Sequence, residues 1–279
     1  MIQTLTGLAP IADTYDGFIV DLWGVVHDGI TPYPDALHCL RQLTGRPVLL
    51  LSNAPRRAHS VRRTLQRLGV ADALYTHILT SGEATWLALR DRKDPWFAAL
   101  GTRVYHIGPV RDRGVIDGVG LTVASSPATA DFVLNTGPDD ERDTAGIEAF
   151  TGDLQNCLQA GLKMVCANPD LEIVRGGARI LCAGALAVWY QAAGGQVRSI
   201  GKPDPAIYTQ ALSILGLPAR RVLAIGDSLR TDIAGAAGAG LDSLWVLGGI
   251  HAAEIAGNPR ATAAKAGLAP TAMIPALAW

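Results

Sequence analysis

The amino-acid sequence predicts an α/β fold, a doubly wound parallel sheet into which a second α/β unit is inserted. Short apolar runs at residues 17–20, 48–51 and 222–225 are each bounded by turn-forming or polar residues, as buried strands of a parallel sheet are. Helical patterns follow these runs, so strands and helices alternate along the chain as they do in this fold class.

The first part of the chain begins the sheet. After the run at 17–20, Pro34 and Asp35 open a helix that we expect to reach residue 43. The second strand, 48–51, leads into an arginine-rich helix over residues 56–68. This strand–helix–strand–helix order is the start of a doubly wound sheet.

The composition changes between about residues 77 and 196, where we expect a compact α/β unit of its own. Residues 108–120 form a connection rich in Gly and Asp, and the glycine pair at 194–195 ends the unit. The expected strands and helices lie at residues 82–90 (helix), 104–107, 131–135, 143–160 (helix), 162–166 and 183–193 (helix).

The first pattern resumes after residue 196. A helix, a strand, a small-residue helix and a last strand are expected at residues 206–215, 222–225, 233–239 and 244–246. We therefore assign residues 1–76 and 197–279 to the core and residues 77–196 to the inserted unit.

Composition excludes several classes of protein. The formal net charge of the 279 residues is −1 and no basic stripe occurs, so we expect neither a nucleic-acid partner nor an anionic membrane surface. No apolar run approaches 18 residues and no signal peptide is recognisable, which predicts no membrane span. The four cysteines lack paired spacing, as expected in a reducing cytoplasm.

Polar residues follow the apolar runs where parallel strands would end side by side. These are Asp21, Ser52 and Asp227, with Asp232 five residues further on and Lys202 in a loop. Carboxylates that converge repel one another unless a cation lies among them, and hard oxygen ligands suit Mg²⁺. The lysine and the hydroxyl add donors for a phosphate group. The constellation therefore predicts in-line phosphoryl transfer to a carboxylate, with Asp21 as the nucleophile.

Four motifs carry a family resemblance. DLWGVVHDG at residues 21–29, LSNA at 51–54, GKP at 201–203 and GDSLRTD at 226–232 follow one another in that order. Together they resemble the motifs of the haloacid dehalogenase (HAD) superfamily of hydrolases, whose core is Rossmann-like. The insert resembles the α/β cap of the class IIA members, which are nucleotide, sugar-phosphate, p-nitrophenyl-phosphate and pyridoxal-phosphate phosphatases. ANPDL and GKPDPAIY, on either side of the last insert helix, strengthen the match.

The resemblance implies a Mg²⁺-dependent phosphatase whose nucleophile, Asp21, forms an aspartyl-phosphate that water hydrolyses. It implies that Mg²⁺ is held by Asp21, the backbone carbonyl of Trp23 and Asp227, with Asp232 ordering its waters. Gly226, before Asp227, is expected to let the backbone turn tightly.

The same resemblance implies a phosphate site and a substrate class. Ser52 and Lys202 would bind the phosphate and stabilise its developing charge, and Asn53 and Ala54 would contribute backbone N–H groups. The partner is then a small phosphorylated metabolite, and the inserted cap would close over it. A homodimer through the cap, common in the resembling family, stays open.

One position departs from the family pattern. The family carries a second aspartate that protonates the leaving group, and here that residue is Trp23. Three outcomes follow: a slow phosphatase, a phosphatase whose acid comes from elsewhere, or a non-catalytic protein that binds a phosphometabolite or has a regulatory role. His27, Asp28 or His106 could replace the acid only if the fold brings it within reach. Dehalogenase chemistry needs no metal, so the intact GDSLRTD motif argues against it.

Overall fold

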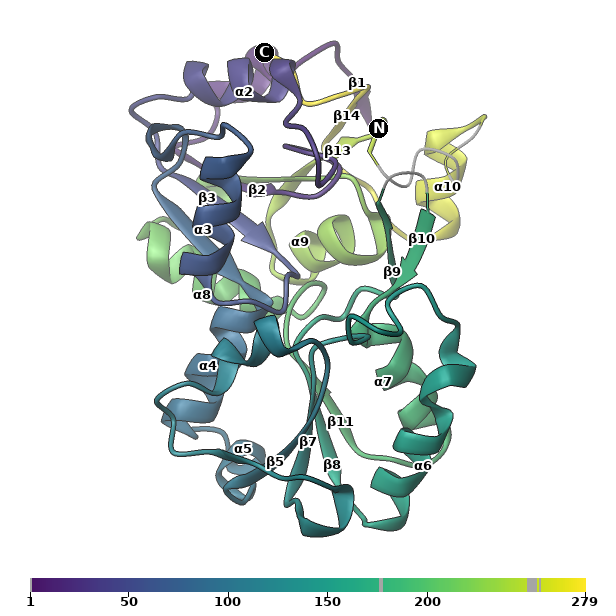
Figure 1. Ribbon diagram of the computed structural model, residues 1–279. Coiled ribbons are helices and arrows are strands. Elements are labelled where there is room, and N and C mark those ends of the chain that lie inside the picture. The colour runs from purple at the N-terminus through teal and green to yellow at the C-terminus, as the bar shows by residue number, and fades with distance from the viewer. Residues whose placement is uncertain (1, 176–177, 250–254, 256) are drawn as a thin grey trace. The chain divides into compact units, whose positions relative to one another are not determined.

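The computed structural model describes residues 2–175, 178–249, 255 and 257–279, which form two compact units (Figure 1). The first unit comprises Met1–Ser52, Val61–Leu79 and Lys202–Trp279, and the second comprises Asn53–Ser60 and Thr80–Gly201. Each unit contains its own parallel sheet. Within the described residues, every helix is too short or too polar to cross a bilayer.

The first unit is built on a seven-stranded sheet in the order β1-β14-β13-β12-β2-β3-β4. From β2 the chain continues outward through β3 to β4, and from β12 it continues the other way through β13 to β14. The sheet therefore has its switch point between the neighbouring parallel strands β2 and β12. The strands are β1 (Gln3–Thr4), β2 (Gly17–Asp21), β3 (Val48–Ser52), β4 (His77–Thr80), β12 (Val222–Gly226), β13 (Asp242–Val246) and β14 (Ala272–Ile274).

The helices on this sheet start and end with recognisable caps. In α8 the Asp204 side chain accepts the Ala206 N–H, Pro205 occupies the first turn, and Gly216 ends the helix in the left-handed conformation. The helices are α1 (Ala9–Ala12), α2 (Pro34–Gln42), α3 (Ala58–Arg67), α8 (Pro205–Leu215), α9 (Ala234–Gly238) and α10 (Pro259–Lys265).

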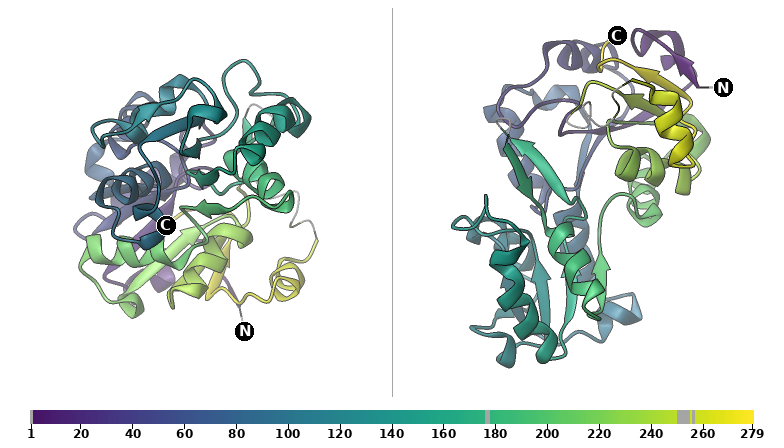
Figure 2. Two further views of the ribbon diagram at one scale, coloured as in Figure 1. Left: turned by 90° about the horizontal axis from the view of Figure 1, so that it is seen from below. Right: turned by 90° about the vertical axis from the view of Figure 1, so that its right-hand side faces the viewer.

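The second unit contains a five-stranded sheet in the order β11-β8-β7-β5-β6. Its strands are β5 (Arg103–Ile107), β6 (Thr122–Val123), β7 (Phe132–Asn135), β8 (Lys163–Cys166) and β11 (Val197–Ser199), and an antiparallel hairpin adds β9 (Glu172–Arg175) and β10 (Ala178–Leu181). Helices α4 (Ser81–Asp91) and α5 (Pro95–Ala98) cover one face, and α6 (Thr151–Gln159) and α7 (Ala183–Ala192) cover the other (Figures 1 and 2).

Alternating side chains of the central strand β7 explain this layered arrangement. Phe132 and Leu134 pack into the core that includes Leu89 of α4, whereas Val133 packs into the core that includes Leu186 of α7. All three β7 side chains are fully buried. A strand that is covered on both faces is continuously apolar, which is why the sequence identified it.

Two expectations for the insert were wrong in detail. The helix expected at 143–160 is α-helical only from Thr151, and a 3-10 turn at Ile147–Phe150 precedes it. Arg142, before this turn, bonds Asp139 and the Ala149 carbonyl oxygen and places its guanidinium over the Phe150 ring. The β9–β10 hairpin lies between residues 166 and 183, where neither a strand nor a helix was expected.

Candidate active site

The strand ends at the switch point of the first unit carry the predicted polar residues. Asp21 is the last residue of β2, Ser52 is the last residue of β3, and Asp227 directly follows β12. These three strands are neighbours in the order β12-β2-β3 and run parallel, so their carboxyl ends share one edge of the sheet. All three residues are buried: the exposed fraction is 7% for Asp21, 8% for Ser52 and 2% for Asp227. This edge is where open α/β sheets place their ligands.

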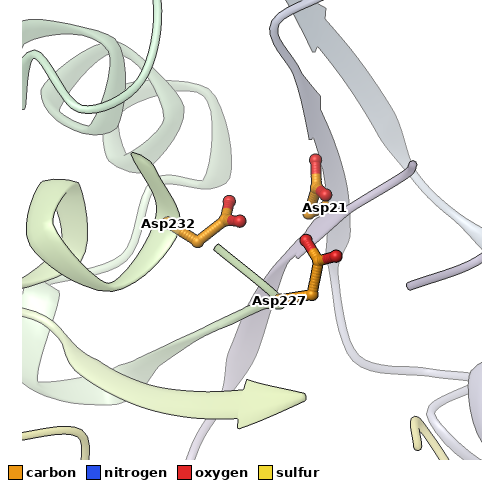
Figure 3. A group of neighbouring side chains, drawn as sticks. All are labelled: Asp21, Asp227 and Asp232. Carbon is orange, nitrogen blue, oxygen red and sulfur yellow. The ribbon is translucent and has the colours of Figure 1, made fainter. Parts of the chain in front are cut away.

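Three carboxylates converge at this edge. Asp21, Asp227 and Asp232 each offer an oxygen, and these oxygens lie within 4.8 Å of one another (Figure 3). Asp227 is held at its backbone by the indole N–H of Trp245, which donates to the Asp227 carbonyl oxygen at 2.9 Å. The structure thus brings together three of the four residues that the sequence assigned to a metal.

The Lys202 ammonium lies among the same three carboxylates. Its Nζ donates to Asp21 Oδ1 at 2.5 Å and to Asp232 Oδ1 at 2.7 Å, and the residue is 3% exposed. Three carboxylates against one ammonium leave an excess of two negative charges among these four buried groups. Oxygen ligands and this excess fit a hard divalent cation, so the acidic group can bind a metal.

Asp232 lies in a π-helical turn directly before α9, and hydrogen bonds hold it there. Leu229–Ile233 forms a π-helical turn, and the Ser228 N–H donates to Asp232 Oδ2 at 3.1 Å. The Tyr208 hydroxyl donates to the Asp232 carbonyl oxygen at 3.0 Å. A Cβ on Gly226 would clash with the Asp232 side chain. Gly226 is therefore needed for close approach, and the tight turn expected there is not marked by a positive φ.

Trp23 is packed against its own loop. A Cβ on Gly29 would collide with the Trp23 ring, and the His27 ring meets Trp23 edge-on with the centroids 5.4 Å apart. His27 Nδ1 accepts the Gly29 N–H at 3.0 Å. Burial lowers the pKa of His27 to about 4, so its imidazole is neutral near pH 7.

Asp28 has a structural role in the same loop. One of its carboxylate oxygens accepts the backbone N–H groups of Ile30 and Thr31 at 2.8 and 2.7 Å. The Thr31 N–H bond is the main cause of a lowered pKa for Asp28, which keeps the group ionised. Asp28 and the neutral His27 therefore hold no proton that dissociates near neutral pH.

The remaining predicted residues belong to the second unit. Asn53 Nδ2 donates to Asp170 Oδ1 at 2.9 Å, and the Ala54 carbonyl oxygen accepts the Gly82 N–H at 3.0 Å. His106 lies at the end of β5, where its Nε2 is 2.8 Å from Thr136 Oγ1. The phosphate-binding role of Asn53 and Ala54 stays a prediction.

His106 makes the stability of the protein dependent on pH. Burial lowers its pKa to about 4, below the ordinary value near 6.5 of an unfolded chain, so the unfolded state binds the proton more readily between these values. The stabilisation is complete above pH 6.5 and is lost as the pH falls toward 4, at a cost of at most about 3 kcal/mol.

Denaturant unfolding of the wild type and His106→Gln at pH 7, 6, 5 and 4 measures this contribution. We expect the variant to lose less unfolding free energy than the wild type over this range, because glutamine does not titrate. Equal losses in the two proteins would show that His106 does not contribute to the acid sensitivity.

Comparison with known proteins places this geometry in a family. Residues 18–122 match the haloacid dehalogenase-like hydrolases and residues 199–277 match the HAD-hydrolase-like family. A haloacid dehalogenase-like hydrolase from Brucella suis shares 33% identity and a TM-score of 0.85, over 98% of this chain and 99% of that one. The chain belongs to the haloacid dehalogenase-like hydrolases.

Two further matches of this HAD-like hydrolase, one to a curated protein and one to a solved structure, come from Mycobacterium tuberculosis. D-glycerol 3-phosphate phosphatase is 31% identical over 87% of this chain and 66% of its own length. A solved structure of a glycerol phosphate phosphatase in complex with calcium is 29% identical, covers 86% of this chain and 68% of that one, and has a TM-score of 0.65.

These comparisons confirm two predictions for the HAD-like hydrolase. The fold class is correct, with a seven-stranded parallel core sheet and a separate five-stranded parallel sheet that forms the cap of the HAD fold. The enzyme class, a HAD-family phosphatase, is also confirmed. Within the haloacid dehalogenase-like hydrolases, the matches indicate the class IIA type that the motifs and the insert resemble.

Proposed function

We propose that this HAD-like hydrolase is a Mg²⁺-dependent phosphatase that acts on a small organic phosphate through an aspartyl-phosphate at Asp21. The observation that carries the proposal is the buried group of three carboxylates and one ammonium at the switch point. Such a group is costly to bury unless a cation offsets its negative charge.

The chain's own residues would divide the work of the reaction. An Asp21 carboxylate oxygen forms a bond to phosphorus as the bond from phosphorus to the ester oxygen breaks. The Ser52 hydroxyl and the Lys202 ammonium donate to the phosphate oxygens, and Lys202 also orients Asp21 through the 2.5 Å hydrogen bond. Water then cleaves the aspartyl-phosphate, which releases inorganic phosphate and restores the carboxylate.

Mg²⁺ would be held by Asp21, Asp227, the Trp23 carbonyl oxygen and Asp232 (directly or through water), and when bound it offsets the negative charge of carboxylates and phosphate. The excess of two negative charges in this group supports a divalent ion. We further propose that residues 77–196 act as the cap that supplies substrate contacts, and that residues 1–76 and 197–279 are the catalytic core.

Trp23 at the position of the family's second aspartate predicts a dependence on the leaving group. Without that acid the departing alkoxide of a sugar or glycerol phosphate lacks a proton donor, and such a donor typically contributes about 10²–10⁴-fold. The p-nitrophenolate ion departs without a proton. We therefore expect p-nitrophenyl phosphate to be cleaved much faster than alkyl phosphates at saturating substrate.

A panel of esters tests the proposal. p-Nitrophenyl phosphate, glycerol 3-phosphate, a nucleoside monophosphate and a hexose phosphate are assayed with Mg²⁺ and again after EDTA treatment. We expect phosphate release that EDTA abolishes and added Mg²⁺ restores. Tight binding of an ester by calorimetry without release would instead identify a non-catalytic phosphometabolite-binding protein.

A further inference from the structure

The segment that follows Ser52 is fixed to distant parts of the second unit. Asn53, which is 3% exposed, donates from Nδ2 to Asp170 Oδ1 at 2.9 Å across 117 positions of the chain. One residue further on, the Ala54 carbonyl oxygen accepts the N–H of Gly82 in the first turn of α4. The Asn53 side chain is therefore held in place by Asp170, and Asn53 directly follows Ser52, whose hydroxyl is proposed to bind phosphate.

Asp170 is itself held in place from two directions. Its backbone N–H donates to Asn168 Oδ1 at 3.0 Å, and its carbonyl oxygen accepts the N–H of Gly184 in the first turn of α7 at 3.0 Å. A Cβ on Gly184 would clash with the Asp170 carbonyl oxygen, which shows how closely α7 approaches this turn. The carboxylate of Asp170 is therefore presented to Asn53 from a rigid turn.

Close packing leaves the Asn53 side chain little freedom. A Cβ on Gly201 would lie 2.6 Å from Asn53 Oδ1 and 2.9 Å from Pro169 Cδ. The buried Asn53 amide therefore lies between the turn that carries Asp170 and the backbone of Gly201. Loss of the acceptor at position 170 would leave a buried N–H group without this bond, and such a loss disfavours the observed conformation of the loop.

We propose that Asp170 is a positioning residue for the phosphate-binding loop: its carboxylate holds the Asn53 side chain and thereby fixes the backbone N–H groups of Asn53 and Ala54. The role of those N–H groups as phosphate donors rests on the proposed function. The fixing of the loop itself does not, because it depends only on contacts within the second unit.

Hydrogen exchange tests the fixing of the loop without any assay of activity. The backbone N–H exchange of a peptide covering residues 49–58, which begins far enough upstream to report Asn53 and Ala54, is measured by mass spectrometry in the wild type, Asp170→Ala and Asp170→Asn. We expect exchange at least about tenfold faster in Asp170→Ala and near the wild-type rate in Asp170→Asn, whose side-chain oxygen still accepts the Asn53 bond. Unchanged exchange in Asp170→Ala would overturn the proposal.

Phosphate affinity tests the consequence for the site. Inorganic phosphate is titrated as a competitive inhibitor against wild type, Asp170→Ala, Asn53→Ala and the double variant, with Mg²⁺ present. We expect each single variant to weaken phosphate binding about tenfold and the double variant to weaken it no further, because Asp170 acts through Asn53. Asp153→Ala, which removes a partner of Arg142 in the same unit, is the matched control and should bind phosphate normally.

A failure of the proposed positioning role of Asp170 and a failure of the proposed phosphatase function would give different results. Effects of Asp170→Ala and Asn53→Ala that add in the double variant would overturn the proposed coupling. A wild-type chain that neither hydrolyses esters nor binds inorganic phosphate would overturn the proposed function, and the exchange data would still decide whether Asp170 fixes the loop.

Discussion

Asp21→Asn is expected to lower kcat for p-nitrophenyl phosphate by about 10⁴-fold, as loss of a covalent nucleophile does in other hydrolases. The amide has no negative charge with which to attack phosphorus, although it keeps the shape of the side chain. Its oxygen can still accept the hydrogen bond from Lys202 that the carboxylate accepts at 2.5 Å in the wild type. The variant should therefore fold and keep its site geometry.

A Tm measurement shows whether the lower kcat of Asp21→Asn reflects lost chemistry and not unfolding. Removal of one carboxylate from a group with an excess of negative charge should leave the Tm measured in EDTA unchanged or raise it. Asp13→Asn is the control, because Asp13 is an exposed partner of Arg46 and should retain full activity. If Asp21→Asn kept more than a tenth of the wild-type kcat, another residue would have to be the nucleophile.

The sequence alone predicted which side chains meet at the switch point. Strand ends can be read from an apolar run that stops at a polar residue, and parallel strands place those ends at one edge. Asp21, Asp227 and Asp232 lie together for that reason. Lys202 comes from a loop, and its motif predicted its place among them.

Other parts of the site depend on contacts that no local pattern encodes. Tyr208 looks like an ordinary apolar-face residue of α8, and only the fold brings its hydroxyl to the backbone of Asp232. The Asn53–Asp170 bond joins residues 117 positions apart. Strands of two or three residues, such as β6 and β14, are too short for periodicity to reveal, so register with their neighbours defines them.

Lys202→Met should destabilise the protein by about 3–5 kcal/mol in EDTA at pH 7.5, because removal of one partner leaves buried carboxylates uncompensated. For a chain of this size the change corresponds to a fall in Tm of about 10 °C. Methionine matches the length of lysine, so the effect reports the lost charge and not a cavity. Thermal unfolding followed by circular dichroism measures it, and Lys265→Met, at an exposed position, is the control that should not change Tm.

Two additions separate a charge effect from a packing effect in Lys202→Met. Saturating Mg²⁺ should recover part of the lost stability, since a ligand that binds only the folded state at 100 times its Kd contributes about 2.7 kcal/mol. Asp232→Asn added to Lys202→Met should also raise Tm, because the lysine bonds Asp232 Oδ1 at 2.7 Å and the double change removes one charge of each sign. A Tm that responds to neither Mg²⁺ nor Asp232→Asn would mean that Lys202 stabilises the fold through packing, and the charge balance that supports the metal site would then be wrong.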